Sequence, residues 1–196
     1  QLTILEACRY NNPHAKVIYA GTRQVYGRPD SLPVNEAHLV RPTDVNGINK
    51  AAGEYYHLVY NNVFGVRACS LRLTNVYGPR QLLKHNRQGF IGWFIRLALE
   101  NRDIEIYGDG TQLRDFVYVK DCVAVMLWLF DNRHVSGVFN LGTGQARSFV
   151  DLVQAIGAAL NQSHGARIVV GPDSFRTVLF NRQSEFLGQK VQCCIP

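Results

Sequence analysis

Short strand-like segments that alternate with helical patterns constrain the fold of this chain more than any other feature. Residues 16–20 form a short apolar run and residues 66–73 repeat the pattern of a buried strand, as in a parallel sheet covered on both faces. Residues 47–61 lie between them and place apolar side chains at a spacing near 3.6, which indicates a helix. The apolar side chains on which this helix is predicted to pack are Ala51, Ala52, Tyr55, Leu58 and Val59. This alternation predicts an α/β fold built on a parallel sheet.

The same reading extends along the rest of the chain. The proline-rich stretch 28–45 is predicted to be a long loop, and Ser148 with Asp151 forms a shortened capping box at a helix start. Further helices are predicted over 2–10, 90–100, 119–130 and 148–160, and further strands over 104–107, 137–141 and 167–170.

Charge and hydropathy exclude several classes of protein. The 196 residues carry a net charge of +6, but the lysines and arginines are dispersed rather than clustered along one element. We therefore do not expect a nucleic-acid partner. No apolar run approaches the length that spans a bilayer, so we expect no membrane partner either.

Cysteine usage predicts a reducing compartment. The five cysteines have neither zinc-binding nor redox spacing, so we expect no metal site. An odd number of cysteines, with no signal-peptide pattern after Gln1, favours free thiols in the cytoplasm.

Four segments carry motifs that are weak alone and specific together. They read GTRQVYG at 21–27, NGINK at 46–50, LRLTNVYGPRQ at 71–81 and IYGDGTQLRDF at 106–116. In this order the segments resemble the extended short-chain dehydrogenase/reductase family, the NAD-dependent nucleotide-sugar epimerases and dehydratases. The resemblance covers roughly residues 2–160 and fades beyond 171.

The resemblance implies part of a doubly wound, Rossmann-like parallel-sheet domain plus a smaller substrate-binding region. No Gly-x-Gly-x-x-Gly motif lies between a strand and a helix, so the N-terminal cofactor-binding portion is expected to be missing. Residues 1–80 would then be the C-terminal part of the NAD-binding domain. Residues 81–174 would be mainly the nucleotide-sugar-binding region with returning Rossmann elements, and 175–196 an atypical tail.

Three residues correspond to the catalytic positions that the resemblance implies. Thr22 matches the Ser/Thr that hydrogen-bonds the reacting oxygen, and Lys50 matches the lysine that binds the nicotinamide ribose. The family's catalytic tyrosine is replaced by Asn46, whose amide does not titrate and cannot act as a general base. Ala20 and Leu73, together with Lys50, are expected to contact the cofactor.

The sequence leaves alternatives open for Asn46. It could line the active site, or it could simply cap the helix that follows, since asparagine is a common N-cap residue. Tyr26, Asp44 or His57 could supply a substitute base, although each could equally be structural. The acidic pair that helps expel water in the dehydratase branch is replaced by Arg23 and Gln24, which argues against dehydration.

The resemblance also implies a site for a nucleotide-diphosphate sugar. Asn75 matches an asparagine that hydrogen-bonds the substrate. Arg114 matches an arginine that pairs with the diphosphate, a role suited to the planar guanidinium fork. Tyr107 matches an aromatic residue near the nucleotide base, with core packing as the alternative. The base and the sugar stay open.

These matches predict an NAD-dependent (or NADP-dependent) nucleotide-sugar epimerase that transiently oxidises a sugar carbon, with a homodimer expected in the full-length form. A catalytically impaired nucleotide-sugar-binding member of the family is the first alternative, because of Asn46. A fragment without autonomous function is the second, because the glycine-rich loop is absent. By itself, the chain is expected to bind NAD poorly.

Overall fold

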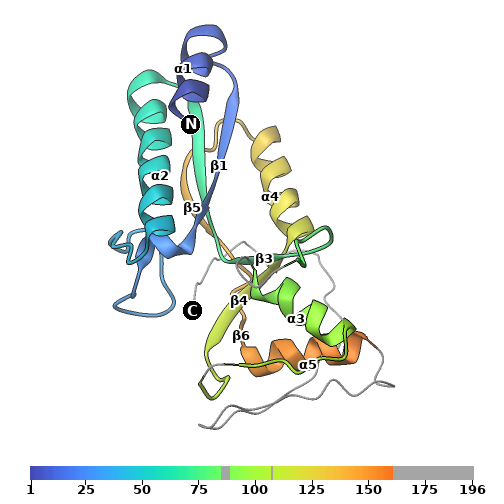
Figure 1. Cartoon of the computed structure of the whole chain (residues 1–196). Helices are drawn as coiled ribbons and strands as arrows, with labels where there is room; N and C mark the ends of the chain where they lie inside the picture. Colours follow the sequence, from blue (N-terminus) through green and yellow to red (C-terminus); the bar gives the residue numbers. More distant parts are fainter. Residues whose placement is uncertain (85–88, 107, 161–196) are drawn as a thin grey trace. The chain divides into compact units, whose positions relative to one another are not determined.

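The structure is a computed structural model that describes residues 1–84, 89–106 and 108–160 (Figure 1). Helices and strands alternate as predicted, and the described chain divides into two compact units. The first unit comprises residues 1–76 and 115–145, and the second comprises residues 77–114 and 146–160. No helix among the described residues is both long enough and apolar enough to cross a bilayer.

A parallel three-stranded sheet forms the centre of the first unit. Its strands are β1 (Lys16–Thr22), β2 (Arg67–Leu73) and β5 (Gly137–Leu141), in the order β1-β2-β5. The register pairs Thr22 with Leu73 and Leu73 with Leu141, so the three strands end side by side at one edge. All three strands confirm the prediction from the sequence.

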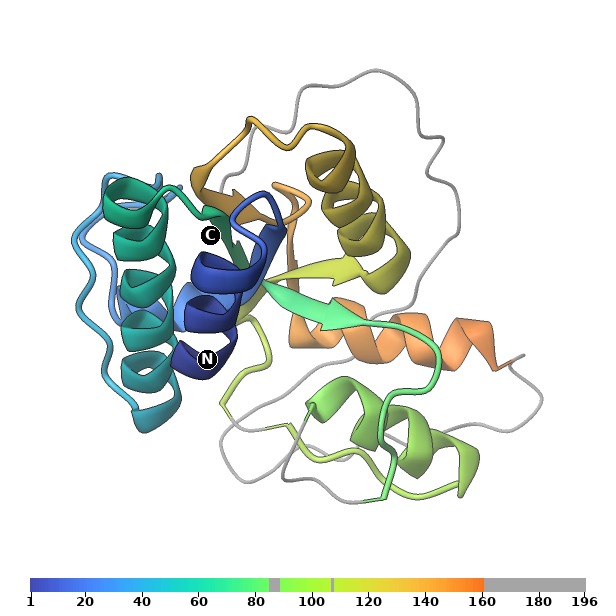
Figure 2. The same cartoon turned by 90° about the horizontal axis from the view of Figure 1, so that it is seen from above.

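Helices cover both faces of this sheet (Figure 2). On one face lie α1 (Leu2–Asn11) and α2 (Val45–Phe64), and on the other lies α4 (Val119–Asp131). Strand β2 contacts helices on both faces of the sheet, because successive side chains of a strand point to opposite faces. Cys69 and Leu71 pack with Leu129 of α4, and Arg72 pairs with Glu54 of α2.

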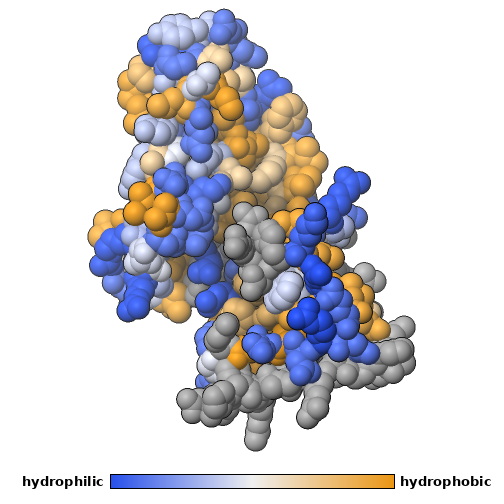
Figure 3. Space-filling view, viewed as in Figure 1, coloured by the Kyte–Doolittle hydropathy of each residue, from blue (hydrophilic) through white to orange (hydrophobic). Residues whose placement is uncertain are grey.

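The predicted packing face of α2 is largely wrong, although Ala51 is buried as expected. Tyr55 and Val59 are 52% and 48% exposed, and Ala52 is exposed as well. The buried stripe instead consists of small, charged and polar residues with one tyrosine: Gly47, Ala51, Gly53, Glu54, His57 and Tyr60. Apolar periodicity pointed to the wrong side because this helix packs through a polar network. Figure 3 shows apolar residues on the surface. The exposed large apolar side chains of α2 and α4 include Val59, Val63, Leu127 and Trp128.

The second unit contains α3 (Phe90–Leu99) and α5 (Phe149–Ala159), which confirm two more predicted helices. The helices contact one another through the rings of Phe90, Phe94 and Phe149. Helix α5 begins with the predicted capping box, in which the Ser148 hydroxyl and the Asp151 carboxylate each accept a bond from the other's backbone.

A second sheet was not predicted from the sequence. Its strands are β3 (Asn75–Tyr77), β4 (Leu113–Tyr118) and β6 (Ala146–Ser148), in the order β3-β4-β6. The short helix η1 (Arg23–Tyr26) was missed too. The strand expected over 104–107 is wrong, since Ile106 forms only an isolated bridge, and the strand expected over 167–170 lies outside the described residues.

Candidate functional site

Thr22 stands at the carboxyl end of β1, where the chain turns into η1. Its hydroxyl oxygen accepts a hydrogen bond from the backbone N–H of Gln24 at 3.3 Å and so caps η1. The same hydroxyl also lies 3.4 Å from the side-chain oxygen of Gln24, to which it can donate. Capping the local backbone and facing the site are therefore compatible roles for this residue.

Asn46 does not cap α2. The N-cap is Asp44, whose carboxylate accepts from the backbone N–H of Gly47 at 2.8 Å. Asn46 is the second residue of the helix and is exposed, and its side-chain amide donates to the side-chain oxygen of Gln24. The capping alternative is thus wrong, because the carboxylate two residues earlier already accepts from the backbone N–H of Gly47 as the N-cap.

Lys50 lies one turn after Asn46 on the same stripe of α2. Its ammonium donates to the backbone carbonyl of Ala20 at 2.7 Å, and so lies near the carboxyl end of β1. The aromatic ring of Tyr19 lies 5.3 Å from this ammonium, and the Tyr19 hydroxyl donates to the Lys50 carbonyl at 3.3 Å. Leu73 is the register partner of Thr22 at the same edge of the sheet.

Gln24 is the residue that connects this cluster, and sequence reasoning missed its role. Its side-chain oxygen faces both Thr22 and Asn46, and its side-chain amide donates to the Asp44 carboxylate at 3.2 Å. Nothing in the sequence links positions 24 and 46 before the fold is known. We call Thr22, Gln24, Asp44 and Asn46 the amide cluster.

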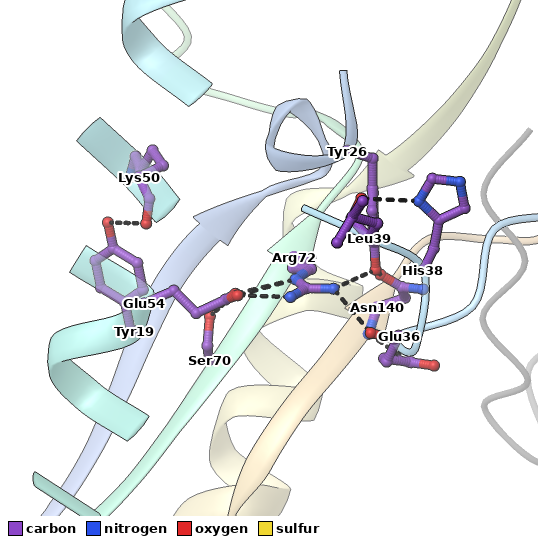
Figure 4. A network of polar contacts seen from close by, with 10 residues as sticks. All are labelled: Tyr19, Tyr26, Glu36, His38, Leu39, Lys50, Glu54, Ser70, Arg72 and Asn140. Carbon is purple, nitrogen blue, oxygen red and sulfur yellow. Dashed lines mark hydrogen bonds and ion pairs between the residues drawn. The ribbon is translucent and has the colours of Figure 1, made fainter. Parts of the chain in front are cut away.

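Tyr26 is not positioned to act as a base in the amide cluster. It is only 2% exposed, and its hydroxyl donates to Asn140 at 2.6 Å while accepting from Arg72 at 2.6 Å (Figure 4). Burial raises the pKa of Tyr26 above its ordinary value of 10.0, although the hydrogen bond from Arg72 opposes this. Its hydroxyl therefore stays protonated near neutral pH.

His57 is also structural. Its ring stacks on Tyr19 at 4.5 Å, and its Nδ1 lies 2.7 Å from the carbonyl of Gly53. Burial lowers the pKa of His57 below 6.5, so the ring is neutral at pH 7. Of the three substitute bases considered, only Asp44 belongs to the amide cluster, and its carboxylate is engaged as the helix cap.

A buried polar network lies in the same unit as the amide cluster (Figure 4). The Arg72 guanidinium pairs with the Glu54 carboxylate at 2.6 Å, with side chains 5% and 1% exposed. Glu54 also accepts from Ser70 at 2.8 Å, and Asn140 accepts from Tyr26 and donates to the carbonyl of Val34 at 3.0 Å. This network ties α2, η1 and the 28–45 loop to β2 and β5.

Asn75 belongs to a separate polar group. Its side-chain amide donates to the backbone carbonyl of Asp115 at 3.0 Å. The Asp115 side chain is 2% exposed and accepts from the backbone N–H groups of Thr143 and Gly144 at 2.9 and 2.8 Å. Asp115 thus fixes both the position of Asn75 and the turn after β5.

Arg114 lies in the second unit. Its guanidinium stands 5.5 Å from the ring centre of Phe149 and donates to the Leu113 carbonyl at 2.7 Å. The planar guanidinium has five N–H donors, and a phosphate can accept bonds from several of them at once. Tyr107, predicted to lie near the nucleotide base, is outside the described residues.

The described residues contain no group of three His, Cys, Asp or Glu side chains placed to hold a metal ion. Cys8, Cys69 and Cys122 are free thiols, and burial raises the pKa of Cys122 to about 11. A thiol with so high a pKa is a poor nucleophile.

Comparison with known proteins agrees with this geometry. The family model described as the NAD dependent epimerase/dehydratase family matches residues 1–142. A Methanocaldococcus jannaschii protein provisionally named UDP-glucose 4-epimerase is 35% identical over 194 residues, which cover 97% of this chain and 62% of that protein. A match of that extent runs past residue 171, so the fading expected from the motifs is corrected. The ADP-L-glycero-D-manno-heptose-6-epimerase of Alkalilimnicola ehrlichii is 37% identical over 145 residues, covering 71% of this chain and 45% of that protein.

Solved structures show the same fold. The UDP-N-acetylglucosamine 4-epimerase of Methanobrevibacter ruminantium, in complex with UDP-N-acetylmuramic acid, superposes with a TM-score of 0.78 at 29% identity. The match covers 90% of this chain and 57% of that one. The UDP-glucose 4-epimerase of Thermus thermophilus, in complex with NAD, gives a TM-score of 0.73 at 29% identity, covering 91% and 59%. The chain therefore spans little more than half the length of these proteins.

Proposed function

We propose that this chain, which belongs to the NAD-dependent epimerase/dehydratase family, forms the substrate side and part of the cofactor side of a nucleotide-sugar epimerase. One observation carries the proposal: Thr22 and the Lys50 ammonium both lie at the carboxyl end of β1. Ligands of open α/β folds bind outside the carboxyl ends of the parallel strands. Relatives named as epimerases of UDP- and ADP-linked sugars support the substrate class.

Lys50 suits the ribose end of a nicotinamide cofactor. Its ammonium has three donors, and the described contact uses a single backbone carbonyl, that of Ala20. The residues at this edge, with Ala20 and Leu73 beside Lys50, thus fit the nicotinamide half of NAD. When bound, NAD would supply the transient removal and return of hydride at a sugar carbon. The glycine-rich loop that would hold its pyrophosphate is not in this sequence.

Each unit offers one residue suited to part of a nucleotide sugar: Arg114 in the second unit suits a diphosphate, and Asn75 in the first suits a sugar hydroxyl. The Arg114 guanidinium is held against Phe149 with a planar fork suited to phosphate oxygens. The Asn75 side-chain N–H group donates to the Asp115 carbonyl, and this bond orients the amide. The side-chain oxygen of Asn75 would then accept a hydrogen bond from a sugar hydroxyl.

A second candidate function is binding of the nucleotide sugar without turnover. The amide cluster favours it, because Thr22 and Asn46 face Gln24 and neither can take a proton near neutral pH. Asn46→Tyr in a version that includes the cofactor-binding half separates the two candidates. Epimerisation of a UDP-sugar is followed through its anomeric proton signals. If only the tyrosine variant shows it, the parent is a binding protein.

Both candidate functions require the chain to bind a nucleoside diphosphate, and this binding can be measured directly. Calorimetric titration with UDP and with ADP should show saturable binding to this chain. Arg114→Met should weaken binding by about tenfold to a hundredfold, because a charge-assisted bond to phosphate is worth roughly 1.5–3 kcal/mol. Arg133→Met, at an exposed arginine over the ring of Phe130, is the matched control and should bind like the unaltered chain. Equal affinities for the two variants would argue against the role of Arg114.

A further inference from the structure

Two hydrogen-bond donors converge on one oxygen in the amide cluster. The Asn46 side-chain amide and the Thr22 hydroxyl, the latter at 3.4 Å, both face the side-chain oxygen of Gln24. These donors come from different elements, α2 and the end of β1, and from positions far apart in the sequence. A neutral hydroxyl and a neutral amide suit an uncharged oxygen, such as that of a hydroxyl or a ketone.

We propose that the Gln24 carboxamide occupies the place of a sugar oxygen, and that a bound nucleotide sugar must displace it. The inference rests on the proposed function and adds a specificity-determining residue to it. A sugar hydroxyl or keto oxygen that entered the cluster would accept the same two hydrogen bonds. Gln24 therefore competes with the sugar and not with the nucleotide.

The backbone of Gln24 is held in place while its side chain can move. Its N–H is bound to the Thr22 hydroxyl oxygen at 3.3 Å, and its carbonyl packs against Gly47 so closely that a Cβ on that glycine would lie 2.8 Å away. The carboxamide is half-buried, and its far end is held by Asp44 at 3.2 Å. Rotation of the side chain breaks contacts of the carboxamide only and leaves η1 intact.

The sugar's contribution to affinity tests the proposal. It is measured as the ratio of the Kd of UDP to the Kd of UDP-glucose, by calorimetry on the full chain. Gln24→Ala should raise this ratio about threefold to tenfold over the unaltered chain, since the sugar no longer competes for two hydrogen bonds. The Kd of UDP alone should stay within about twofold.

Gln24→Glu distinguishes displacement from a general change of packing. The glutamate is made together with Asp44→Asn throughout, because a carboxylate at position 24 would otherwise repel the Asp44 carboxylate, which the Gln24 amide contacts at 3.2 Å. The glutamate keeps the size and the accepting oxygen, and its charge strengthens the bonds from Thr22 and Asn46. The ratio for Gln24→Glu should therefore stay at or below that of the unaltered chain. Asn62→Ala removes an exposed amide at the far end of α2, which contacts only Asn61 in the described structure, and should leave the ratio unchanged.

The outcomes separate the inference from the proposed function. If UDP binds and the Gln24→Ala ratio does not rise, or Gln24→Glu raises it equally, Gln24 does not compete with the sugar and the inference is overturned. If neither UDP nor UDP-glucose binds to any variant, the proposed function fails and the inference falls with it. Side-chain amide signals of Asn46 that shift on adding UDP-glucose but not UDP are the expected spectroscopic counterpart.

Discussion

One stripe of α2 passes through two chemically different regions. Asn46, Lys50 and Glu54 follow one another at intervals of four residues and so share a face of the helix. Glu54 is 1% exposed and fully engaged by Arg72 and Ser70, whereas Asn46 is exposed and contacts the half-buried carboxamide of Gln24. Within two turns the helix goes from an accessible cluster to a closed ionic network.

The difference shows why the residue at position 46 can change without loss of the fold. A buried charge cannot lose its partner cheaply, so the Glu54–Arg72 pair constrains the sequence strongly. An exposed side chain at the second position of a helix carries little of the folding free energy. An asparagine at position 46, where the resemblance predicts a tyrosine, is therefore compatible with an intact fold.

Breaking the closed network should have the largest effect. Arg72→Met leaves the Glu54 carboxylate buried without its cation, at a cost of about 3–5 kcal/mol in the free energy of unfolding. Urea denaturation followed by circular dichroism measures the loss. The double variant Glu54→Leu with Arg72→Met should recover most of it, since apolar pairs replace buried ion pairs well. A loss below about 1 kcal/mol for Arg72→Met would mean that the network does not constrain the fold.

Gly47→Ala tests the contact between α2 and η1, where the two regions meet. A Cβ at this position would lie 2.8 Å from the Gln24 carbonyl oxygen and 2.9 Å from the Pro42 side chain. We expect a loss of about 1–3 kcal/mol from overpacking, despite the higher helix propensity of alanine. Asn49→Ala, exposed in the same turn, should change the unfolding free energy by less than about 0.5 kcal/mol. If the two variants had the same free energy of unfolding, the close approach at Gly47 would not be the source of any destabilisation.

His57 should make the closed side of α2 sensitive to acid. Burial lowers the pKa of His57 below its ordinary value of 6.5, so as the pH falls the unfolded chain takes up a proton before the folded chain does. The stability from this residue is present above pH 6.5 and is lost as the pH falls through the folded pKa. His57→Phe keeps a ring against Tyr19 and removes the titration.

Urea midpoints at several pH values check this prediction. Between about pH 7 and pH 5 the unaltered chain should lose more stability than His57→Phe, and between about pH 7 and pH 8 the two should run parallel. If stability fell with pH equally steeply in both proteins between about pH 7 and pH 5, His57 would take up its proton equally in the folded and the unfolded chain.

The sequence predicted the strands of the first unit because they are short runs bounded by helices. It missed β4 because Arg114 and Asp115 interrupt the apolar pattern, and β3 and β6 because each has only three residues. It also chose the wrong face of α2, since Glu54 and His57 are buried through polar contacts that hydropathy does not register. Propensity and periodicity describe local patterns, and these features depend on partners far along the chain.

The candidate site was predicted as a set of positions and not as a set of contacts. Motif spacing located Thr22 and Lys50, and the structure brings both to the end of β1. The contacts of Gln24 with Asn46 and Asp44 join residues 22 and 20 positions apart, so no local pattern contains them. The same applies to the pairing of Tyr26 with Asn140, 114 positions away, which removes Tyr26 from the list of bases.

The smallest expected effect lies in the amide cluster itself, and it separates capping from ligand binding. Asp44→Ala removes the carboxylate that accepts from Gly47 and should cost about 1 kcal/mol in unfolding free energy, as N-cap substitutions do. Asn46→Ala should cost less than about 0.5 kcal/mol, because its amide contacts only a side chain at the surface. Thermal and urea unfolding of the two variants side by side give the comparison. If Asn46→Ala lost more unfolding free energy than Asp44→Ala, Asn46 would be the helix cap. Its presence would then be explained by capping alone, without a role in binding a sugar oxygen.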